Sequence, residues 1–419
     1  MGLLRRQLVT AALTANALRP VGGWRAGIPA FVAGMMTSEL APQLLTLTAA
    51  DALTDVGRGR RNSIGLALAA GNALALAHLV RRSAQVKDRV EDALTEAIGV
   101  DYAEQLDAEP TPADLRTSWR SLATPFRILT PEIEVTRGLP YTEAGRRGHL
   151  DIYRPRDVDL DRAPVLLQVH GGAWTIGEKE RQGLPLMVQL ASKGWVCVAI
   201  NYRLAPRDPF PAQIIDVKRA IAWIKEHIAE YGGDPDYLAI TGGSAGGHLA
   251  ALAALTPGDP AYQPGFEEVD TSVQVAVPHY GVYDLAGATG LRSATAMRDR
   301  FLAPRVMQRT WEEDPHLFEA ASPLLRVTPD APDFFVLHGT ADTLVSVEQA
   351  RLFVARLREV SKRSVVYAEL PGAQHAYDIF TSVRCGHVVR AIDRYLHWHW
   401  NAYRRERGMV ADRTTHPTT

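Results

Sequence analysis

Continuous apolar runs alternate with amphipathic stretches from about residue 150 onward. Short apolar runs rich in β-branched residues are typical of buried strands, and they occur at 150–155, 164–170, 195–201, 237–242, 273–279, 333–338 and 364–369. Helical periodicity separates them, at about 183–193, 213–231, after 245, 346–361 and 387–406. Strands that are apolar throughout and alternate with helices predict a mostly parallel sheet covered on both faces, an α/β fold.

The first 85 residues have a different pattern. Three apolar segments, at 8–18, 27–36 and 63–80, are separated by arginines. The third has 18 uncharged residues, which just reaches the length of a bilayer helix, although Asn72 and His78 make its insertion energy marginal. Arginines on both sides leave its orientation open, and no small-x-small site indicates a cleaved signal peptide.

We therefore expect residues 1–85 to be a helical extension that associates with the cell membrane or envelope. The alternative is a helical bundle packed on the catalytic part or in a dimer interface of a cytoplasmic protein.

Composition narrows the possible partners. The formal net charge of −1 gives no electrostatic reason to expect a nucleic-acid partner. The two cysteines, Cys197 and Cys385, do not form a disulfide framework. His397 and His399 lie two residues apart in a predicted helix and so on different faces, and no metal site is expected.

A serine stands at a sharp turn between a predicted strand and a predicted helix. Residues 242–246 read Gly-Gly-Ser-Ala-Gly, after the apolar run 237–241 and before an alanine- and leucine-rich stretch. A nucleophile elbow needs small residues two before and two after the serine, because bulky side chains there would collide across the turn. Gly242 and Gly246 meet that requirement, so we expect Ser244 to be a catalytic nucleophile.

A glycine pair follows an earlier strand and predicts an oxyanion hole. The run 165–170 leads directly into Gly171 and Gly172, and acyl transfer needs backbone N–H groups aimed at the developing oxyanion. We expect the amides of Gly171, Gly172 and Ala245 to be these donors; the alternative is an ordinary strand-to-loop turn. Trp174, two residues further on, is expected either to line the substrate pocket or to pack against a cap.

An acid and a base follow the serine in the chain order of an α/β-hydrolase sheet. Asp342 comes just after the strand at 333–338, and His375 follows the last strand. His375 is expected to take the proton from Ser244, with Asp342 orienting its imidazole. Asp378 is the alternative acid, but three residues from His375 it is poorly placed to reach the far ring nitrogen.

Together these motifs resemble the hormone-sensitive-lipase-like esterases over roughly residues 130–400. The resemblance rests on six motifs in the right order: 170–174 (HGGAW), 201–206 (NYRLAP), 210–212 (FPA) with Asp216, 242–247 (GGSAGG), Asp342 and His375. It implies an α/β-hydrolase fold with a helical cap. The chain departs from the family pattern at Ala173, where a third glycine is usual, and at Gly243, where an acidic residue is usual. The overall look is most similar to the membrane-associated carboxylesterases and lipases of actinobacteria, which carry a long N-terminal extension.

These observations predict a division of the chain. Residues 1–85 form the apolar extension, 86–130 a linker with cap helices, and 131–407 the catalytic domain. The segment 284–330, which interrupts the strand alternation, is expected to be a cap insertion, or alternatively a surface helical excursion. Residues 408–419 are expected to be a disordered tail.

The predicted function is hydrolysis of a small-molecule or lipid carboxylic ester through an acyl-enzyme, without metal or cofactor. The alternatives are an amidase or arylformamidase that uses the same triad, and a non-catalytic binding protein on the same scaffold. Such a binder is expected to lack a triad member, whereas all three candidates are present here.

Overall fold

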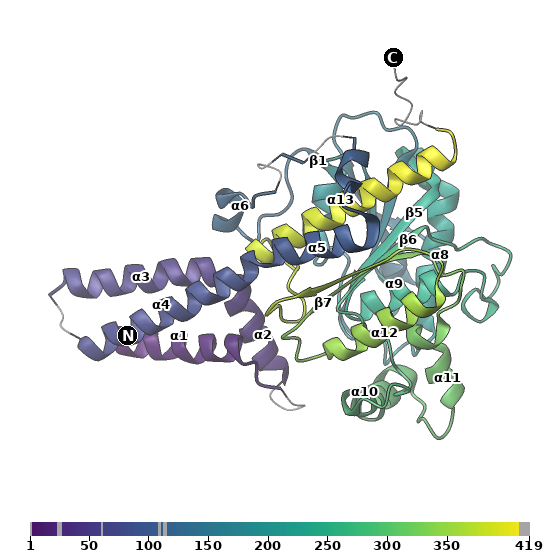
Figure 1. The fold of residues 1–419 in the computed structure, drawn as a ribbon. Helices are drawn as coiled ribbons and strands as arrows, with labels where there is room; N and C mark the ends of the chain where they lie inside the picture. Colours follow the sequence, from purple (N-terminus) through teal and green to yellow (C-terminus); the bar gives the residue numbers. More distant parts are fainter. Residues whose placement is uncertain (1, 23–26, 60–61, 108–109, 112–114, 410–419) are drawn as a thin grey trace, which may run out of the picture.

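A computed structural model of the chain describes residues 2–22, 27–59, 62–107, 110–111 and 115–409 (Figure 1). The tail that the sequence predicts to be disordered, 408–419, lies almost entirely outside the described residues. The helices are α1 (Leu3–Leu18), α2 (Gly27–Glu39), α3 (Ala41–Gly57), α4 (Ser63–Ala84), α5 (Val86–Ile98), α6 (Trp119–Ala123), α7 (Leu184–Ala191), α8 (Ala212–His227), α9 (Ala245–Leu255), α10 (Arg292–Met297), α11 (Pro315–Ala320), α12 (Val347–Val360) and α13 (Val383–Glu406). The strands are β1 (Ile133–Pro140), β2 (His149–Pro155), β3 (Ala163–Val169), β4 (Val196–Ile200), β5 (Gly233–Gly243), β6 (Val275–His279), β7 (Asp333–Gly339) and β8 (Val365–Leu370).

Eight strands of the described residues form one mostly parallel sheet, which confirms the predicted fold class. Their order is β1-β2-β4-β3-β5-β6-β7-β8. Strands β3 to β8 run parallel, whereas β2 is antiparallel to both β1 and β4. The seven predicted strands are all present. β1 was missed, because its partly exposed, mixed pattern lacks the continuous apolar run of the central strands.

The sheet separates two hydrophobic cores, and successive residues of each strand point into opposite ones. Val165 and Leu167 of β3 face the core made with α8, α9 and α12, and Leu166 faces the core made with α5, α7 and α13. Burial on both faces explains why these strands are apolar throughout.

Helix α5 differs from the expectation for the 86–130 segment. The sequence predicts a linker with cap helices here, but Val86, Val90 and Leu94 are buried in the core that α5, α7 and α13 form on one face of the sheet, where α5 contacts α13 and β8. Its strong amphipathic pattern therefore serves to cover the sheet, and residues 86–98 do not form a cap.

The insertion at 284–330 is helical, as predicted. It contains α10, a π-helix at Arg298–Met307 and α11, and it lies beneath α12 in Figure 1. The amide of Phe210 donates to the carbonyl of Val306 at 2.9 Å, so the insertion packs on the loop that leads into α8.

Helices α1 to α4, here called the N-terminal bundle, extend away from the sheet and its covering helices (Figure 1). Helix α1 packs on α2 and α4, and α3 packs on α4. The three predicted apolar segments lie in α1, α2 and α4. Helix α3 was not predicted, because its apolar positions are interrupted by threonines and aspartates.

A buried ion pair joins the N-terminal bundle to the rest of the molecule. Glu39, at the end of α2, contacts Arg384 of α13, and neither side chain is exposed. The hydroxyl of Ser382 also donates to the Glu39 carboxylate at 2.7 Å. Burial lowers the pKa of Arg384 to about 9, and the adjacent carboxylate is what makes a guanidinium tolerable there.

Replacement of Arg384 by Met should destabilise the protein by about 3–5 kcal/mol, because Glu39 would remain buried without its cation. Chemical denaturation of the purified protein measures this change. Arg356→Met is the matched control: its partner Glu359 is 68% exposed, so the loss there should stay below about 1 kcal/mol. Equal losses in the two variants would contradict a structural role for the buried pair.

Candidate active site

Ser244 lies at the turn between β5 and α9 with φ 59° and ψ −120°. A positive φ is strained for serine and is typical of a nucleophile elbow. A Cβ on Gly242 would lie 2.6 Å from the backbone of Gly246, so the two glycines do meet across the turn. The backbone N–H of Ser244 donates to the carbonyl of His279 at 3.0 Å, which ties the elbow to the end of β6.

The structure brings His375 and Asp342 together from the loops after β8 and β7. Nδ1 of His375 lies 2.7 Å from Oδ2 of Asp342. Oδ1 of Asp342 accepts from the amides of Leu344 and Val345, each at 2.9 Å. Nε2 of His338 lies 3.2 Å from Oδ2. The carboxylate is thus held in one orientation, with its partner imidazole bound through Nδ1.

The charge on Asp342 is stable despite its complete burial. Burial alone would raise the pKa of the carboxyl, but the attraction of His375 and the hydrogen bonds from His338 and His375 outweigh it and lower the pKa well below its usual range. Asp342 is therefore ionised at neutral pH and can stabilise an imidazolium on His375.

One glutamine joins the two loops that carry this pair. Oε1 of Gln374 accepts from the amide of Thr343 at 2.8 Å and from the amide of His375 at 2.9 Å. The acid loop and the histidine loop are thus held in register independently of the Asp342–His375 contact.

Asp378, the alternative acid, has other partners. Its carboxylate accepts a hydrogen bond from the hydroxyl of Tyr280 and lies 3.3 Å from Nδ1 of His279. The geometry therefore favours Asp342 over Asp378 as the partner of His375.

The loop after β3 reaches the elbow. A Cβ on Gly171 would lie 3.2 Å from Cβ of Ser244. The amide of Gly171 donates to Oε1 of Gln182 at 2.6 Å, so this expected oxyanion donor already has a protein acceptor. Ala245 begins α9, directly after the serine.

Trp174 is only 2% exposed, and its indole N–H donates to Nδ1 of His248 at 3.1 Å. Burial lowers the pKa of His248 to about 4, so the ring is neutral, and its Nε2–H donates to the carbonyl of Ala321 at 2.8 Å. Trp174 is thereby linked to the 284–330 insertion, which favours the packing alternative for this residue.

Phe31 of α2 contacts the candidate catalytic histidine, which the sequence did not reveal. Its ring meets the imidazole of His375 edge-on, with centroids 5.7 Å apart. Periodicity predicted an apolar segment at 27–36 but carries no information on which distant surface that segment covers.

Comparison with known proteins shows which family the chain belongs to. The model of the family described as BD-FAE matches residues 150–357, a span that contains Ser244 and Asp342 and ends before His375. The chain is 46% identical over 416 residues to the probable carboxylic ester hydrolase LipM of Mycobacterium tuberculosis, with 94% of this chain and 93% of that protein covered. It is 43% identical to the esterase LipQ of the same organism, with 87% and 83% covered.

The chain belongs to the hormone-sensitive-lipase-like esterases. Among solved structures, a butyrate-bound thermophilic esterase of Thermogutta terrifontis is similar with a TM-score of 0.52 and 26% identity. The match covers 69% of this chain and 97% of that one. The esterase thus shares the α/β-hydrolase fold with these proteins.

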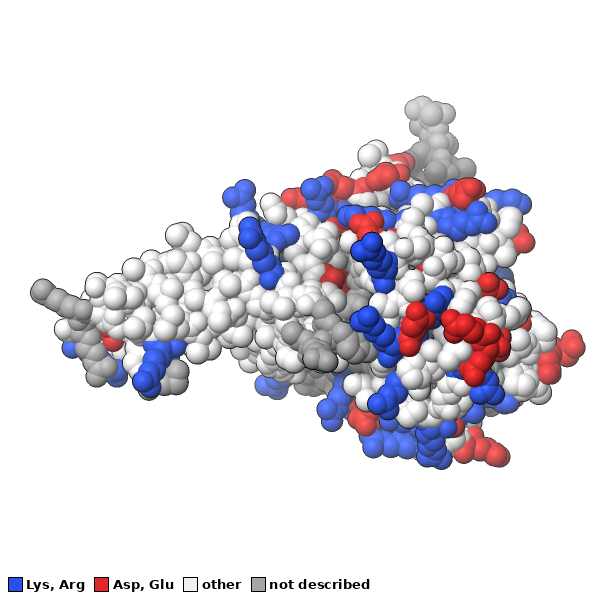
Figure 2. All heavy atoms as spheres, turned by 90° about the horizontal axis from the view of Figure 1, so that it is seen from below, with Lys and Arg blue, Asp and Glu red and all other residues white. Residues whose placement is uncertain are grey.

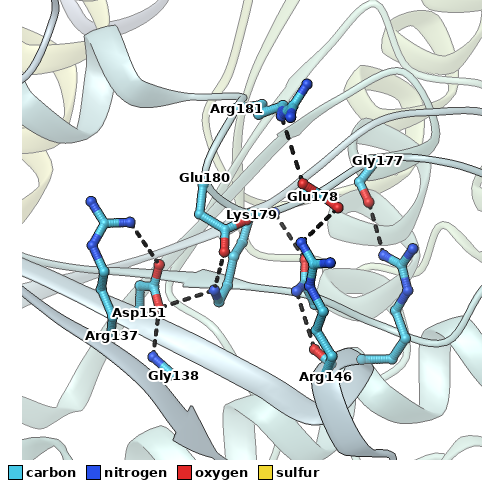
Figure 3. A network of polar contacts seen from close by, with 11 residues as sticks. Arg137, Gly138, Arg146, Asp151, Gly177, Glu178, Lys179, Glu180 and Arg181 are labelled. Atoms are coloured by element: carbon cyan, nitrogen blue, oxygen red, sulfur yellow. Dashed lines mark hydrogen bonds and ion pairs between the residues drawn. The ribbon is translucent and has the colours of Figure 1, made fainter.

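A polar network supports the loop that carries Gly171 and Gly172 in this esterase (Figure 3). The ammonium of Lys179 lies 3.0 Å from Oδ1 of Asp151 on β2, with the two side chains 5% and 0% exposed. Its backbone N–H donates to Oδ1 of Asn201 at 2.9 Å, and Arg147 donates to the carbonyl of Gly177 at 2.8 Å. The loop is thus fastened to the β1–β2 edge of the sheet.

Lys179→Met should destabilise the esterase by about 3–5 kcal/mol, because it removes the buried cation that pairs with the buried Asp151 carboxylate. The remaining cation, Arg137, is half-exposed and 3.9 Å away. It should also lower kcat about 10-fold, because the loop beside Ser244 would shift. Thermal unfolding and hydrolysis of a short ester measure the two effects. Arg181→Met is the control, since its side chain is 81% exposed; a loss in that variant as large as in Lys179→Met would contradict the anchoring role.

Proposed function

We propose that this esterase hydrolyses carboxylic esters through an acyl-enzyme formed on Ser244. The observation that carries the proposal is the Asp342–His375 pair, which the loops after β7 and β8 hold together. In the sheet order these two strands lie on the same side of β5, the strand that leads into the elbow of Ser244, with β6 between. The names of the relatives, a probable carboxylic ester hydrolase and an esterase, support the same reaction.

In the proposed mechanism, Ser244 Oγ attacks the ester carbonyl while His375 Nε2 takes its proton. Asp342 stabilises the imidazolium, the alcohol leaves with a proton from His375, and water then hydrolyses the acyl-enzyme by the same groups. The backbone amides of Gly172 and Ala245 are the proposed oxyanion donors. Gly171 can join them once a substrate oxygen displaces the side-chain oxygen of Gln182.

We further propose that residues 131–407 act as the catalytic domain and that the 284–330 insertion forms part of a cap. The hydrogen bond from His248 to Ala321 supports this assignment, because it links the insertion to Trp174 in the loop beside the elbow.

We also propose that the N-terminal bundle seats the esterase on a lipid bilayer. Its polarity pattern is partly inverted relative to a water-soluble bundle: several large apolar side chains face outward, and several polar ones are buried beside a small apolar core. Leu47, Leu53 and Leu74 are 64%, 72% and 75% exposed, and Figure 2 shows few charged side chains on this part of the surface except at its far end and its base. A large exposed apolar surface rimmed by charge is typical of a membrane-contact site.

Three polar residues of the bundle, Asn72, Gln7 and Asp51, are hydrogen-bonded to one another. Nδ2 of Asn72 donates to Oε1 of Gln7 at 2.9 Å, and Gln7 donates to Asp51 at 3.0 Å. Asn72, which made the 63–80 segment marginal by composition, therefore need not face lipid. Helix α4 has 22 residues, a length of about 33 Å at 1.5 Å per residue, close to the thickness of a bilayer core.

The same bundle borders the active site. Because Phe31 of α2 contacts His375, a bilayer-bound N-terminal bundle would hold the site close to the lipid surface. This supports lipid esters as the substrate class and the cell membrane or envelope as the location.

Ser244→Ala should lower ester hydrolysis by at least about 10⁴-fold with the fold intact, since the nucleophile is lost. Asp342→Asn should cost about 10⁴-fold in kcat by favouring the wrong imidazole tautomer. The measurement is hydrolysis of p-nitrophenyl esters from acetate to palmitate in detergent, with the wild type alongside. Near-normal rates in Ser244→Ala would refute the acyl-enzyme. A folded wild type active only on p-nitroanilides would indicate an amidase, and one inactive on both would indicate a binding protein.

Replacing Leu47, Leu53 and Leu74 together by Gln should lower binding to lipid vesicles by more than about 100-fold, because each buried leucine contributes about 1.5–3 kcal/mol. Flotation with vesicles measures the binding, and hydrolysis of a soluble butyrate ester should stay within about twofold. The control replaces exposed apolar residues of the catalytic part, Val158, Leu325 and Leu352, by Gln. If the wild type fails to bind vesicles and instead self-associates through these leucines, the bundle is an interface between copies of the chain.

A further inference from the structure

Tyr280 lies immediately after β6 in an unusual backbone conformation. Its φ is +36°, which a tyrosine adopts only where the surrounding structure imposes it. Its amide donates to the carbonyl of Leu337 in β7 at 2.7 Å, and its side chain is almost completely buried. The strain turns the ring toward the loop that carries His375.

The tyrosine ring packs on the candidate general base. The centroids of the Tyr280 and His375 rings are 4.6 Å apart, at an interplanar angle of 56°. The hydroxyl of Tyr280 donates to the carboxylate of Asp378. Because Asp378 is three residues beyond His375, this hydrogen bond ties Tyr280 to the same loop that carries the imidazole.

Gly243, the residue before Ser244, provides the space for this tyrosine. A Cβ at that position would lie 2.4 Å from the Tyr280 hydroxyl oxygen and 2.7 Å from two of its ring carbons. Tyr280 is therefore in contact with the nucleophile elbow on one side and with His375 on the other.

His279, the last residue of β6, also connects the elbow with the histidine loop. Its carbonyl accepts the backbone N–H of Ser244 at 3.0 Å, and its Nδ1 lies 3.3 Å from Oδ2 of Asp378. The last residue of β6 and the residue after it thus both contact the histidine loop through Asp378, and His279 also holds the elbow through its carbonyl.

We infer that Tyr280 is a positioning residue that fixes the orientation of the His375 imidazole relative to Ser244. Asp378 binds its hydroxyl, and the absence of a side chain at Gly243 leaves room for its ring. The inference rests on the proposed function of this site. Asp342 binds one nitrogen of the imidazole but leaves the ring free to rotate about that hydrogen bond. The tilted ring contact with Tyr280, together with the edge contact of Phe31, limits this rotation, so Nε2 stays directed toward the elbow.

The test compares Tyr280→Phe and Tyr280→Leu with the wild type on a short p-nitrophenyl ester. Tyr280→Phe keeps the ring and loses the hydrogen bond to Asp378, so kcat should fall about 10-fold, and Tyr280→Leu should lower it about 100-fold because the imidazole is no longer held in place. KM should stay within about twofold in both, since the substrate contacts remain. A general loss of structure would instead lower thermal stability and the fraction of active enzyme without this split.

A double-variant cycle tests the role of Gly243. Gly243→Ala alone should lower kcat about 100-fold, because the new methyl group displaces Tyr280. In the Tyr280→Leu background, which lacks the colliding atoms, the same change should cost no more than about twofold, a clear departure from additivity. Equal costs in the two backgrounds would overturn the link between Gly243 and Tyr280.

Tyr283→Phe is the matched control, because Tyr283 is a buried tyrosine of the same loop that stacks on Phe353 instead of on His375. Its kcat should equal that of the wild type. Folded Tyr280→Phe and Tyr280→Leu variants with kcat within twofold of the wild type would overturn the inference. Should Tyr280→Leu fail to fold, Tyr280→Phe decides by itself. The proposed function fails separately, if Ser244→Ala retains activity.

Discussion

The buried carboxylate of Asp342 is the group around which the site is organised. An isolated carboxylate is very costly to bury, and here two backbone amides, His338 and His375 offset that cost. These partners come from the end of β7, from the turn after it and from the loop after β8. The alignment of two neighbouring parallel strands is therefore a condition for a stable charge on Asp342, and that carboxylate orients the imidazole of His375 through Nδ1.

The N-terminal bundle depends on a different balance. Some of its polar groups are paired in the interior, as between Asn72 and Gln7, whereas several of its leucines are exposed on the outside. In water the exposed leucines contribute no hydrophobic stabilisation, whereas in a bilayer the same side chains would be removed from water and would contribute it. The buried contact between Glu39 and Arg384 then fixes the bundle to α13, and Phe31 reaches His375 from the same helix. If the bundle binds a bilayer as proposed, α2 would connect the membrane-bound part directly to the candidate catalytic histidine.

Much of the fold followed from the sequence, because buried parallel strands carry a strong apolar signal. Ser244, Asp342 and His375 could be proposed from chain order and from the positions of strand ends. β1 and α3 could not be recognised, since a half-exposed edge strand and a helix that buries Thr48 and Asp55 lack a clear apolar period. The contact of Phe31 with His375 and the hydrogen bond between Gln182 and Gly171 were equally inaccessible. Both join residues whose proximity depends on tertiary packing, which no local pattern encodes.

The structure gives a physical reason for the glycine at position 243, where the chain departs from the family pattern. The family pattern that the sequence resembles has an acidic residue at this position, and the sequence alone marks the glycine only as an exception. In the structure any side chain there would overlap Tyr280. The acidic group that contacts this tyrosine is Asp378, which accepts a hydrogen bond from its hydroxyl. A carboxylate beside the elbow is thus supplied from the histidine loop rather than from the elbow itself. Because Asp378 and His375 share that loop, the hydrogen bond from Tyr280 to Asp378 ties this tyrosine to the segment that carries the imidazole.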